Sequence, residues 1–166
     1  MRSISKKIIL AGSFCVGKTS LISRFVYSRF PFSYQTTLGV RIDKKVVALD
    51  EASLNMIIWD IGGEQTQARV PESYYLGSSG VIYVFDLSRP SSFFNMVDDI
   101  NFIKKKLPRT PIITVGNKTD LLDEQTLEEV KNILPIKADY YTSAKTGKHV
   151  ETVFIKLAQA MIENVR

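Results

Sequence analysis

The segment GSFCVGKT, residues 12–19, has the residue types and spacing of a phosphate-binding loop. It matches G-x-x-x-x-G-K-[ST], and it lies between a strand-like run, IILA, and a helix-like run, SLISRFVY. Gly12 and Gly17 allow backbone N–H groups to converge on phosphate oxygens, and the helix N-terminus attracts negative charge. Lys18 is expected to reach the β- and γ-phosphates, and the Thr19 hydroxyl is expected to bind Mg²⁺. The loop is completed by Ser13, Phe14, Cys15, Val16 and Ser20. The motif predicts a nucleoside triphosphate ligand and leaves the base and the outcome open.

Two further loops carry residues suited to reading the base. They are Asn117, Lys118 and Asp120 after the run PIITVG, and Ser143, Ala144 and Lys145 after the run ADYYT. The Asp120 carboxylate can accept two hydrogen bonds from the N1 and N2 side of guanine, and adenine offers no such pair of donors. At about 1.5–3 kcal/mol for each bond, the pair favours guanine by roughly 10²–10⁴-fold. Asn117 and the N–H of Ala144 are expected to read guanine with Asp120. Lys118 could lie along the base or support the phosphate loop.

Apolar runs and turn residues predict the elements that carry these loops. Runs without alternation, at 8–12, 55–61, 81–87 and 111–117, predict strands buried on both faces. The run 40–50 partly alternates and is charged, so it predicts an edge strand, joined by a turn at 51–53 to a strand over 54–60. Ser91 and Ser92 can cap a helix with an apolar stripe, a weaker helix covers about 124–134, and a last helix follows Val150. The stripe of the first of these helices consists of Phe93, Val97, Ile100, Ile103 and Leu107.

Strands that alternate with helices predict an α/β fold with a six-stranded, mostly parallel sheet, one antiparallel edge strand and helices on both faces. Ligands bind such sheets at the carboxyl ends of the strands. The phosphate loop and both base-reading loops follow predicted strands, so the sequence places all three at the same edge of the sheet.

Composition narrows the remaining classes of protein. A chain of 166 residues predicts one domain, residues 1–166. No apolar run reaches the roughly 18 residues of a membrane span, and neither terminus carries a signal core, a myristoylation glycine or a prenylation signal. We therefore expect a cytoplasmic monomer, peripheral on a membrane only if a lipid-bearing tail is missing. One cysteine fits a reducing compartment, the net charge of +5 is too modest to predict a nucleic-acid partner, and His149 is assigned no role.

The motifs, in their order along the chain, resemble those of the Ras-like small GTPases and are closest to the Rab branch. The matching segments are GSFCVGKT, TTLGV, WDIGG, SYYLGSSG, VFDLS, VGNKTDL and TSAKTG, and they cover nearly the whole chain. The resemblance implies a P-loop GTPase fold and a molecular switch that binds GTP or GDP with Mg²⁺ and hydrolyses GTP slowly. It also implies that loops around 30–40 and 61–77 present a changing surface to effector, exchange-factor and activating proteins.

The resemblance assigns roles to five residues outside the loops described above. Thr37 would bind Mg²⁺ and the γ-phosphate only when GTP is present, Asp60 would hold Mg²⁺ through water, and the Gly63 N–H would bond the γ-phosphate. Phe30 would pack its edge on guanine, and Tyr34 could close over the phosphates. One additional phosphate could thus order two loops, and hydrolysis would release both.

The stretch WDIGGEQTQ, residues 59–67, departs from the family at a catalytic position. Glu64 stands where the family has a water-orienting glutamine, and Gln65 follows it. A carboxylate accepts a hydrogen bond from water, but it cannot donate to the phosphoryl oxygens and its charge opposes theirs. Slow turnover is therefore the leading hypothesis, with Glu64, Gln65, Lys18 and Gly63 as the catalytic set. The alternatives are that Glu64 acts as a stronger base, that Gln65 rotates into its place, or that Glu64 points to solvent.

Other departures concern the phosphate loop and the partner surface. The bulky Phe14 could obstruct an arginine supplied by another protein, or its ring could turn outward. Cys15 is more simply an incidental small residue than a redox control. Arg41 and Ile42 stand where the Rab pattern has an acidic residue and a phenylalanine, and Gln67 lacks the aromatic ring expected in the second switch. Partner identities therefore cannot be carried over.

Two functions compete with a hydrolysing switch. The first is a GTP-bound scaffold with little hydrolysis, which Glu64 and Phe14 would favour. The second is a small-molecule kinase with a phosphate loop, against which stand the segments NKTD and SAK and the lack of an arginine-rich lid segment.

Overall fold

Six strands form one sheet in the order β2-β3-β1-β4-β5-β6. The computed structural model describes residues 2–31, 33, 37, 39–50, 52–62 and 69–164. The strands are β1 (Arg2–Ala11), β2 (Val40–Ala48), β3 (Ala52–Ile61), β4 (Ser78–Asp86), β5 (Ile112–Asn117) and β6 (Tyr140–Tyr141). Only the pair β2–β3 is antiparallel among these strands, and the other neighbours run parallel. The predicted sheet, with its antiparallel edge strand, is confirmed.

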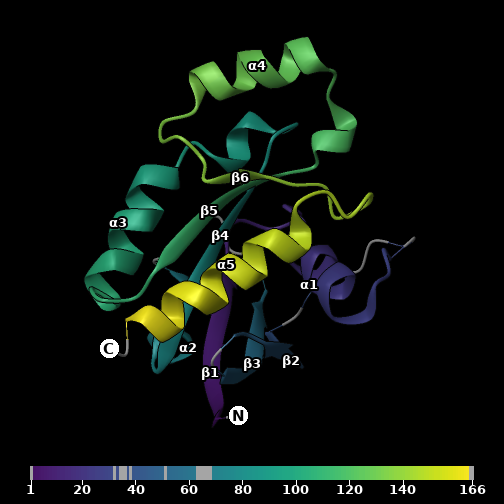
Figure 1. Cartoon of the computed structure of the whole chain (residues 1–166). Coiled ribbons are helices and arrows are strands. Elements are labelled where there is room, and N and C mark those ends of the chain that lie inside the picture. Colours follow the sequence, from purple (N-terminus) through teal and green to yellow (C-terminus); the bar gives the residue numbers. More distant parts are fainter. Residues whose placement is uncertain are drawn as a thin grey trace.

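Helices cover both faces of the sheet (Figure 1). On one face lie α1 (Lys18–Tyr27) and α5 (Val150–Glu163), and on the other lie α2 (Glu72–Tyr75), α3 (Met96–Lys106) and α4 (Glu124–Ile133). Short 3₁₀ turns, η2 (Pro90–Ser92) and η3 (Thr119–Leu121), follow β4 and β5. All five parallel strands therefore end at one edge of the sheet, where their loops meet.

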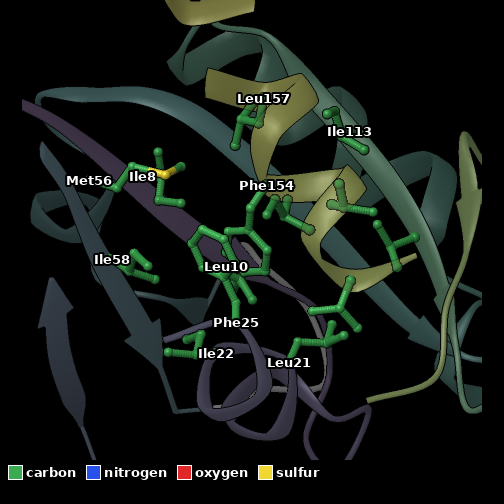
Figure 2. Close-up of a cluster of buried hydrophobic side chains, with 14 of the residues drawn as sticks. Ile8, Leu10, Leu21, Ile22, Phe25, Met56, Ile58, Ile113, Phe154 and Leu157 are labelled. Atoms are coloured by element: carbon green, nitrogen blue, oxygen red, sulfur yellow. The ribbon is translucent and has the colours of Figure 1, made fainter. Parts of the chain in front are cut away.

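The α1–α5 face is packed around two stacked rings. The rings of Phe25 and Phe154 lie 4.1 Å apart at an interplanar angle of 5°. β1 contributes Ile8 and Leu10 to the same cluster, both with no exposed surface (Figure 2). The loop after β1 leads directly into α1, so this packing fixes both sides of the phosphate loop.

The opposite face contains a buried polar pair within an apolar cluster. The Tyr83 hydroxyl on β4 donates a 2.6 Å hydrogen bond to Asp99 Oδ2 on α3, and both residues are buried. Burial, with the nearby Asp99 carboxylate, raises the pKa of Tyr83 and of Tyr75 at the end of α2. This hydrogen bond joins β4 to α3 within the apolar cluster that also contains Tyr75 of α2.

Several predicted boundaries were wrong. β1 begins at Arg2 because its polar first half pairs with β3 from Arg2↔Ala52 to Leu10↔Asp60. The β2–β3 turn is tighter than predicted, since Leu49 and Ala52 exchange both backbone hydrogen bonds. The short helix α2 was not predicted.

The helix predicted from Ser91 begins instead at Met96. Ser92 does not cap it, because its hydroxyl accepts from the Asp86 N–H at 2.9 Å and lies 2.7 Å from the Arg89 carbonyl, which fixes the η2 turn to the end of β4. Val97, predicted to be in the buried stripe, is 39% exposed, whereas Ile100 and Ile103 of that stripe are buried together with Met96.

Candidate functional site

A cavity of about 780 Å³ opens where the parallel strands end. Its walls come from the segment after β1, the start of α1, the segment before β2, the end of β3 and the loops after β5 and β6. Most predicted site residues line it, namely Phe14, Cys15, Gly17, Lys18, Thr19, Ser20, Phe30, Thr37, Asp60, Asn117, Lys118, Asp120, Ala144 and Lys145. Four other predicted site residues do not line the cavity and are buried, namely Gly12, Ser13, Val16 and Ser143.

The phosphate loop depends on glycine at two positions. Gly12 has a φ of 137° and Gly17 a φ of 102°, a backbone region that L side chains rarely adopt. A Cβ on Gly12 would lie 2.1 Å from the Val84 carbonyl oxygen, and one on Gly17 would lie 2.2 Å from Asn117 Nδ2. The loop can therefore approach both β4 and the loop after β5 only without side chains at these positions.

Lys18 lies beneath this loop with 6% of its surface exposed. Its ammonium donates to the carbonyl oxygens of Gly12 at 2.8 Å and Ser13 at 2.9 Å. Burial lowers the pKa of Lys18 to about 8, although the Asp60 carboxylate acts in the opposite direction. The site thus holds a desolvated cation that an anionic ligand would stabilise.

Three oxygen-bearing side chains converge beside Lys18. Thr19 Oγ1 lies 2.8 Å from Thr37 Oγ1, and it donates a 2.6 Å hydrogen bond to Asp60 Oδ2. Asp60 is 1% exposed, its Oδ1 is buried without a hydrogen-bond partner among the described residues, and burial raises its pKa. A carboxylate oxygen left without a donor beside two hydroxyls is a donor set that suits Mg²⁺.

Asn117 connects the phosphate loop to the loop after β6. Its Nδ2 donates to the Val16 carbonyl at 3.1 Å, and its Oδ1 accepts from Thr142 Oγ1 at 3.0 Å and the Ala144 N–H at 3.3 Å. Two groups predicted to read the base are therefore bonded to each other in this structure. Asn117 acts here as a brace between loops.

Lys118 adopts the second of its two predicted arrangements. It has left-handed backbone angles, and its ammonium donates to the Cys15 carbonyl at 2.8 Å while pairing with Asp86 Oδ2 at 2.8 Å. Because Asp86 is buried at the end of β4, the lysine ties the phosphate loop to the sheet. Cys15 itself has a φ of 62°, so a loop position that favours glycine carries a side chain.

Asp120 is exposed at the wall of the cavity and is oriented by a neighbour. The Ser143 hydroxyl donates a 2.7 Å hydrogen bond to Asp120 Oδ1. From α1, Arg24 bonds the carbonyls of Ala144 at 2.9 Å and Lys145 at 2.5 Å. The loop after β6 is thus held from both sides with the Asp120 carboxylate facing the cavity.

Phe14 lies at the rim of the cavity with 48% of its surface exposed, as in the outward-turned alternative. The Arg89 guanidinium lies over its ring, with Cζ 5.1 Å from the ring centroid, and Nη2 donates to the Phe14 carbonyl. An arginine of this chain therefore already covers the ring beside the phosphate loop.

The geometry agrees with the comparisons with known proteins. The family model of the Ras family matches residues 7–163. The chain belongs to the Ras family. It is 37% identical over 166 residues to Ras-related protein Rab-7b of Mus musculus, which covers 95% of this chain and 82% of the relative. It is 33% identical to Ras-related protein Rab-7b of Bos taurus, over 99% of this chain and 86% of the relative. The same identity is found with Ras-related protein Rab-7b of Homo sapiens, over 98% and 89% of the two chains.

This Ras-family protein is therefore a small GTPase of the Rab branch and a GTP-binding molecular switch. Members of the family are GTPases that bind guanine nucleotide, in general with Mg²⁺, and act through regulatory and effector partners. No helix in the described ranges is long and apolar enough to span a membrane.

Four predicted site residues of this small GTPase, Tyr34, Gly63, Glu64 and Gln65, lie outside the described residues, as does Gln67. Their predicted roles stay predictions.

Residues of β2, β3 and α2 form the surface that flanks the predicted second switch. Ile42 on β2 is 50% exposed and pairs across the strands with Trp59, whose ring lies 6.3 Å from that of Tyr74. Lys7 on β1 lies 3.7 Å over the Trp59 ring and donates to the Tyr74 carbonyl at 2.8 Å. Lys7 and Trp59 thus hold Tyr74 of α2 against the sheet, next to the exposed Ile42.

Sequence reasoning missed four residues that support the site of this GTPase. Asp86 had a local signal, because a carboxylate ended a fully apolar run. Arg24, Arg89 and Thr142 had none, since their partners are 120, 75 and 25 positions away.

Proposed function

We propose that this GTPase is a Mg²⁺-dependent, guanine-nucleotide-controlled switch that hydrolyses GTP slowly. The observation that carries the proposal is the convergence of Thr19, Thr37 and Asp60 beside Lys18. Thr19 and Asp60 belong to α1 and β3, whereas Thr37 belongs to the segment that joins α1 to β2. A ligand held by all three couples that segment to the phosphate site.

In this proposal the chain binds the phosphates with the N–H groups of residues 12–20 and the Lys18 ammonium. Thr19 and Thr37 would hold Mg²⁺, and Asp60 would hold it through water. The cation would supply positive charge that neutralises the β- and γ-phosphates. Thr37 reaches the γ-phosphate only in the GTP state, so loss of that phosphate frees the segment around it and changes the surface at residues 30–40.

Asp120 supports a preference for guanine because Ser143 holds its carboxylate at the cavity wall. The Ala144 N–H donates a hydrogen bond to Asn117 Oδ1, and Phe30 lines the same cavity. We assign Asp120 the N1 and N2 donors of guanine, and Ala144, Asn117 and Lys145 the remaining edge of the base.

The preference is tested by measuring the Kd of GDP and of ADP for the wild type and for Asp120→Ala. The wild type should favour GDP by roughly 10²–10⁴-fold, and the variant should lose most of that ratio. Glu124→Ala is the matched control, because Glu124 is an exposed carboxylate at the start of α4 and outside the cavity wall. A wild type that prefers ADP would contradict the switch and favour the kinase alternative.

The rate of hydrolysis rests on Glu64, with Gly63 and Gln65 beside it. The carboxylate cannot donate to a phosphoryl oxygen, so we expect single-turnover GTP hydrolysis by the wild type to be slow and by Glu64→Gln to be faster. Gln65→Ala tests whether Gln65 orients the attacking water in place of Glu64. If it does, this substitution should slow GTP hydrolysis relative to the wild type. A wild type faster than Glu64→Gln would show that the carboxylate is a working base.

Partners are proposed to bind at the surface formed by the two switch regions. The exposed Ile42 beside Trp59 supports an apolar contact there. We place effectors, exchange factors and activating proteins at this surface, and we propose that the protein is a cytoplasmic monomer or peripheral on a membrane.

A further inference from the structure

Arg41 brings an additional positive charge to the edge of the cavity. In the antiparallel β2–β3 ladder its Cα lies directly opposite that of Asp60, and directly paired residues project from the same face of a sheet. Arg41 also lines the cavity of the phosphate loop. Its guanidinium therefore belongs to the same wall as the proposed Mg²⁺ ligand Asp60.

A second carboxylate anchors Arg41 at this position. Its Nε lies 3.2 Å from Oδ2 of Asp43, two residues further along β2 and 6% exposed. The Tyr27 hydroxyl fixes the other oxygen of Asp43 with a 2.6 Å hydrogen bond. Asp43 thus holds the guanidinium on the face of the β2–β3 ladder that carries Asp60, while the Arg41 side chain stays 46% exposed. The Arg41 charge opposes the rise that burial causes in the pKa of Asp60.

An arginine here changes the electrostatics of the site. Guanidinium is charged at every accessible pH, so it attracts the Asp60 carboxylate and repels a divalent cation near it. The Rab pattern carries an acidic residue at this position, so the sign of the charge is reversed in this chain. Lys18 adds a further cation near Asp60, and among the described residues Asp43 is the carboxylate that forms an ion pair with Arg41.

We propose that Arg41 is a positioning residue of the Mg²⁺ site that competes with the cation for Asp60 and so raises the Mg²⁺ concentration needed to retain bound nucleotide. The inference rests on the proposed function, because it requires the Mg²⁺ and nucleotide site described above. As a consequence, nucleotide release responds to changes in Mg²⁺ concentration. At the same concentrations, a protein with an acidic residue at position 41 would keep its Mg²⁺ site saturated.

The test measures release of a fluorescent GDP analogue from the purified protein as free Mg²⁺ is varied. Arg41→Gln should lower the Mg²⁺ concentration for half-maximal retention by about tenfold, given one charge near a divalent ion in a partly exposed site. Arg41→Lys retains the charge and should stay near the wild type. Asp43→Asn removes the negative charge that offsets the Arg41 guanidinium, so it should raise the half-maximal concentration.

Lys45→Gln is the matched control. Lys45 projects from the same face of β2 but pairs with Met56, and its ammonium donates to the Phe25 carbonyl. Lys45→Gln removes the same charge as Arg41→Gln. It should shift the Mg²⁺ dependence less than about twofold, because Lys45 lies four residues along β2 from Arg41. Direct Mg²⁺ titration of the GDP complex by calorimetry gives a second readout that needs no turnover.

The outcomes separate the two proposals. GDP binding with the same Mg²⁺ dependence in the wild type and Arg41→Gln would overturn the role of Arg41 alone. An equal shift in Lys45→Gln would do the same, since it would show a general effect of net charge. No GDP binding at any Mg²⁺ concentration would overturn the proposed function and this inference together.

Discussion

At the scale of single residues, the site depends on groups that are buried without full compensation. Lys18 is desolvated beneath the phosphate loop, and the Asp60 Oδ1 atom lacks a donor among the described residues. Each costs free energy unless a group of opposite charge compensates it. Each also favours a ligand of opposite charge, so the cost is recovered on binding.

Lys18 makes nucleotide binding depend on pH. Burial lowers the pKa of Lys18 to about 8, so the ammonium is present below that pH and is lost as pH rises through it. Bound phosphates restore the charged form. Above about pH 8 the GDP affinity should therefore fall by up to tenfold for each pH unit, with uptake of a proton on binding.

Calorimetry in two buffers of different ionisation enthalpy measures that uptake. Proton uptake should be absent near pH 7 and approach one proton near pH 9, and Lys18→Ala should abolish it. Equal binding enthalpies in the two buffers near pH 9 would contradict the pKa assigned to Lys18.

At the scale of elements, the loops are fixed by side chains that reach across the sheet edge. Lys118 and Asn117 attach the loop after β5 to the phosphate loop, and Arg24 attaches α1 to the loop after β6. On the other face, Tyr83 of β4 and Asp99 of α3 are joined by a buried hydrogen bond near the end of α2.

Tyr83→Phe should lower the free energy of unfolding by about 1–3 kcal/mol, because the buried Asp99 carboxylate loses a donor. Chemical denaturation of Tyr83→Phe, Asp99→Asn and the double variant measures the coupling. The second substitution should cost less when the first is present, and additive changes would show that the 2.6 Å contact contributes nothing specific.

At the scale of the whole molecule, the nucleotide cavity exists only because loops from four strands meet at one edge of the sheet. Nucleotide and Mg²⁺ should therefore stabilise the folded chain as a unit. At a ligand concentration of about 100 times Kd the gain is about 2.7 kcal/mol, which corresponds to a rise in Tm of roughly 5–10 °C for a chain of this size.

Removal of the metal tests this prediction. Addition of EDTA to the GDP complex should lower the Tm, whereas Asp60→Ala should already have the lower Tm and respond little to EDTA. An equal response of both proteins to EDTA would place the metal away from Asp60.

The sequence by itself determined the parts of the molecule that are local. The phosphate loop is a contiguous motif whose glycines allow backbone N–H groups to converge on phosphate oxygens, and apolar runs bounded by turns predicted the central strands of the sheet. The order of the motifs also indicated the family. These patterns can be read from the sequence because each depends on residues that are neighbours along the chain.

The tertiary structure alone decided how those parts are held. Pairing with β3 extends β1 through the mostly polar residues 2–7, and Lys7 pairs with β4 as well. Ser92 accepts a hydrogen bond from the Asp86 N–H and does not cap a helix. It also placed Arg41 opposite Asp60. The physical reason is that hydrogen bonds and charges act over a few ångströms in space, and the residues they join here lie up to 121 positions apart in the chain.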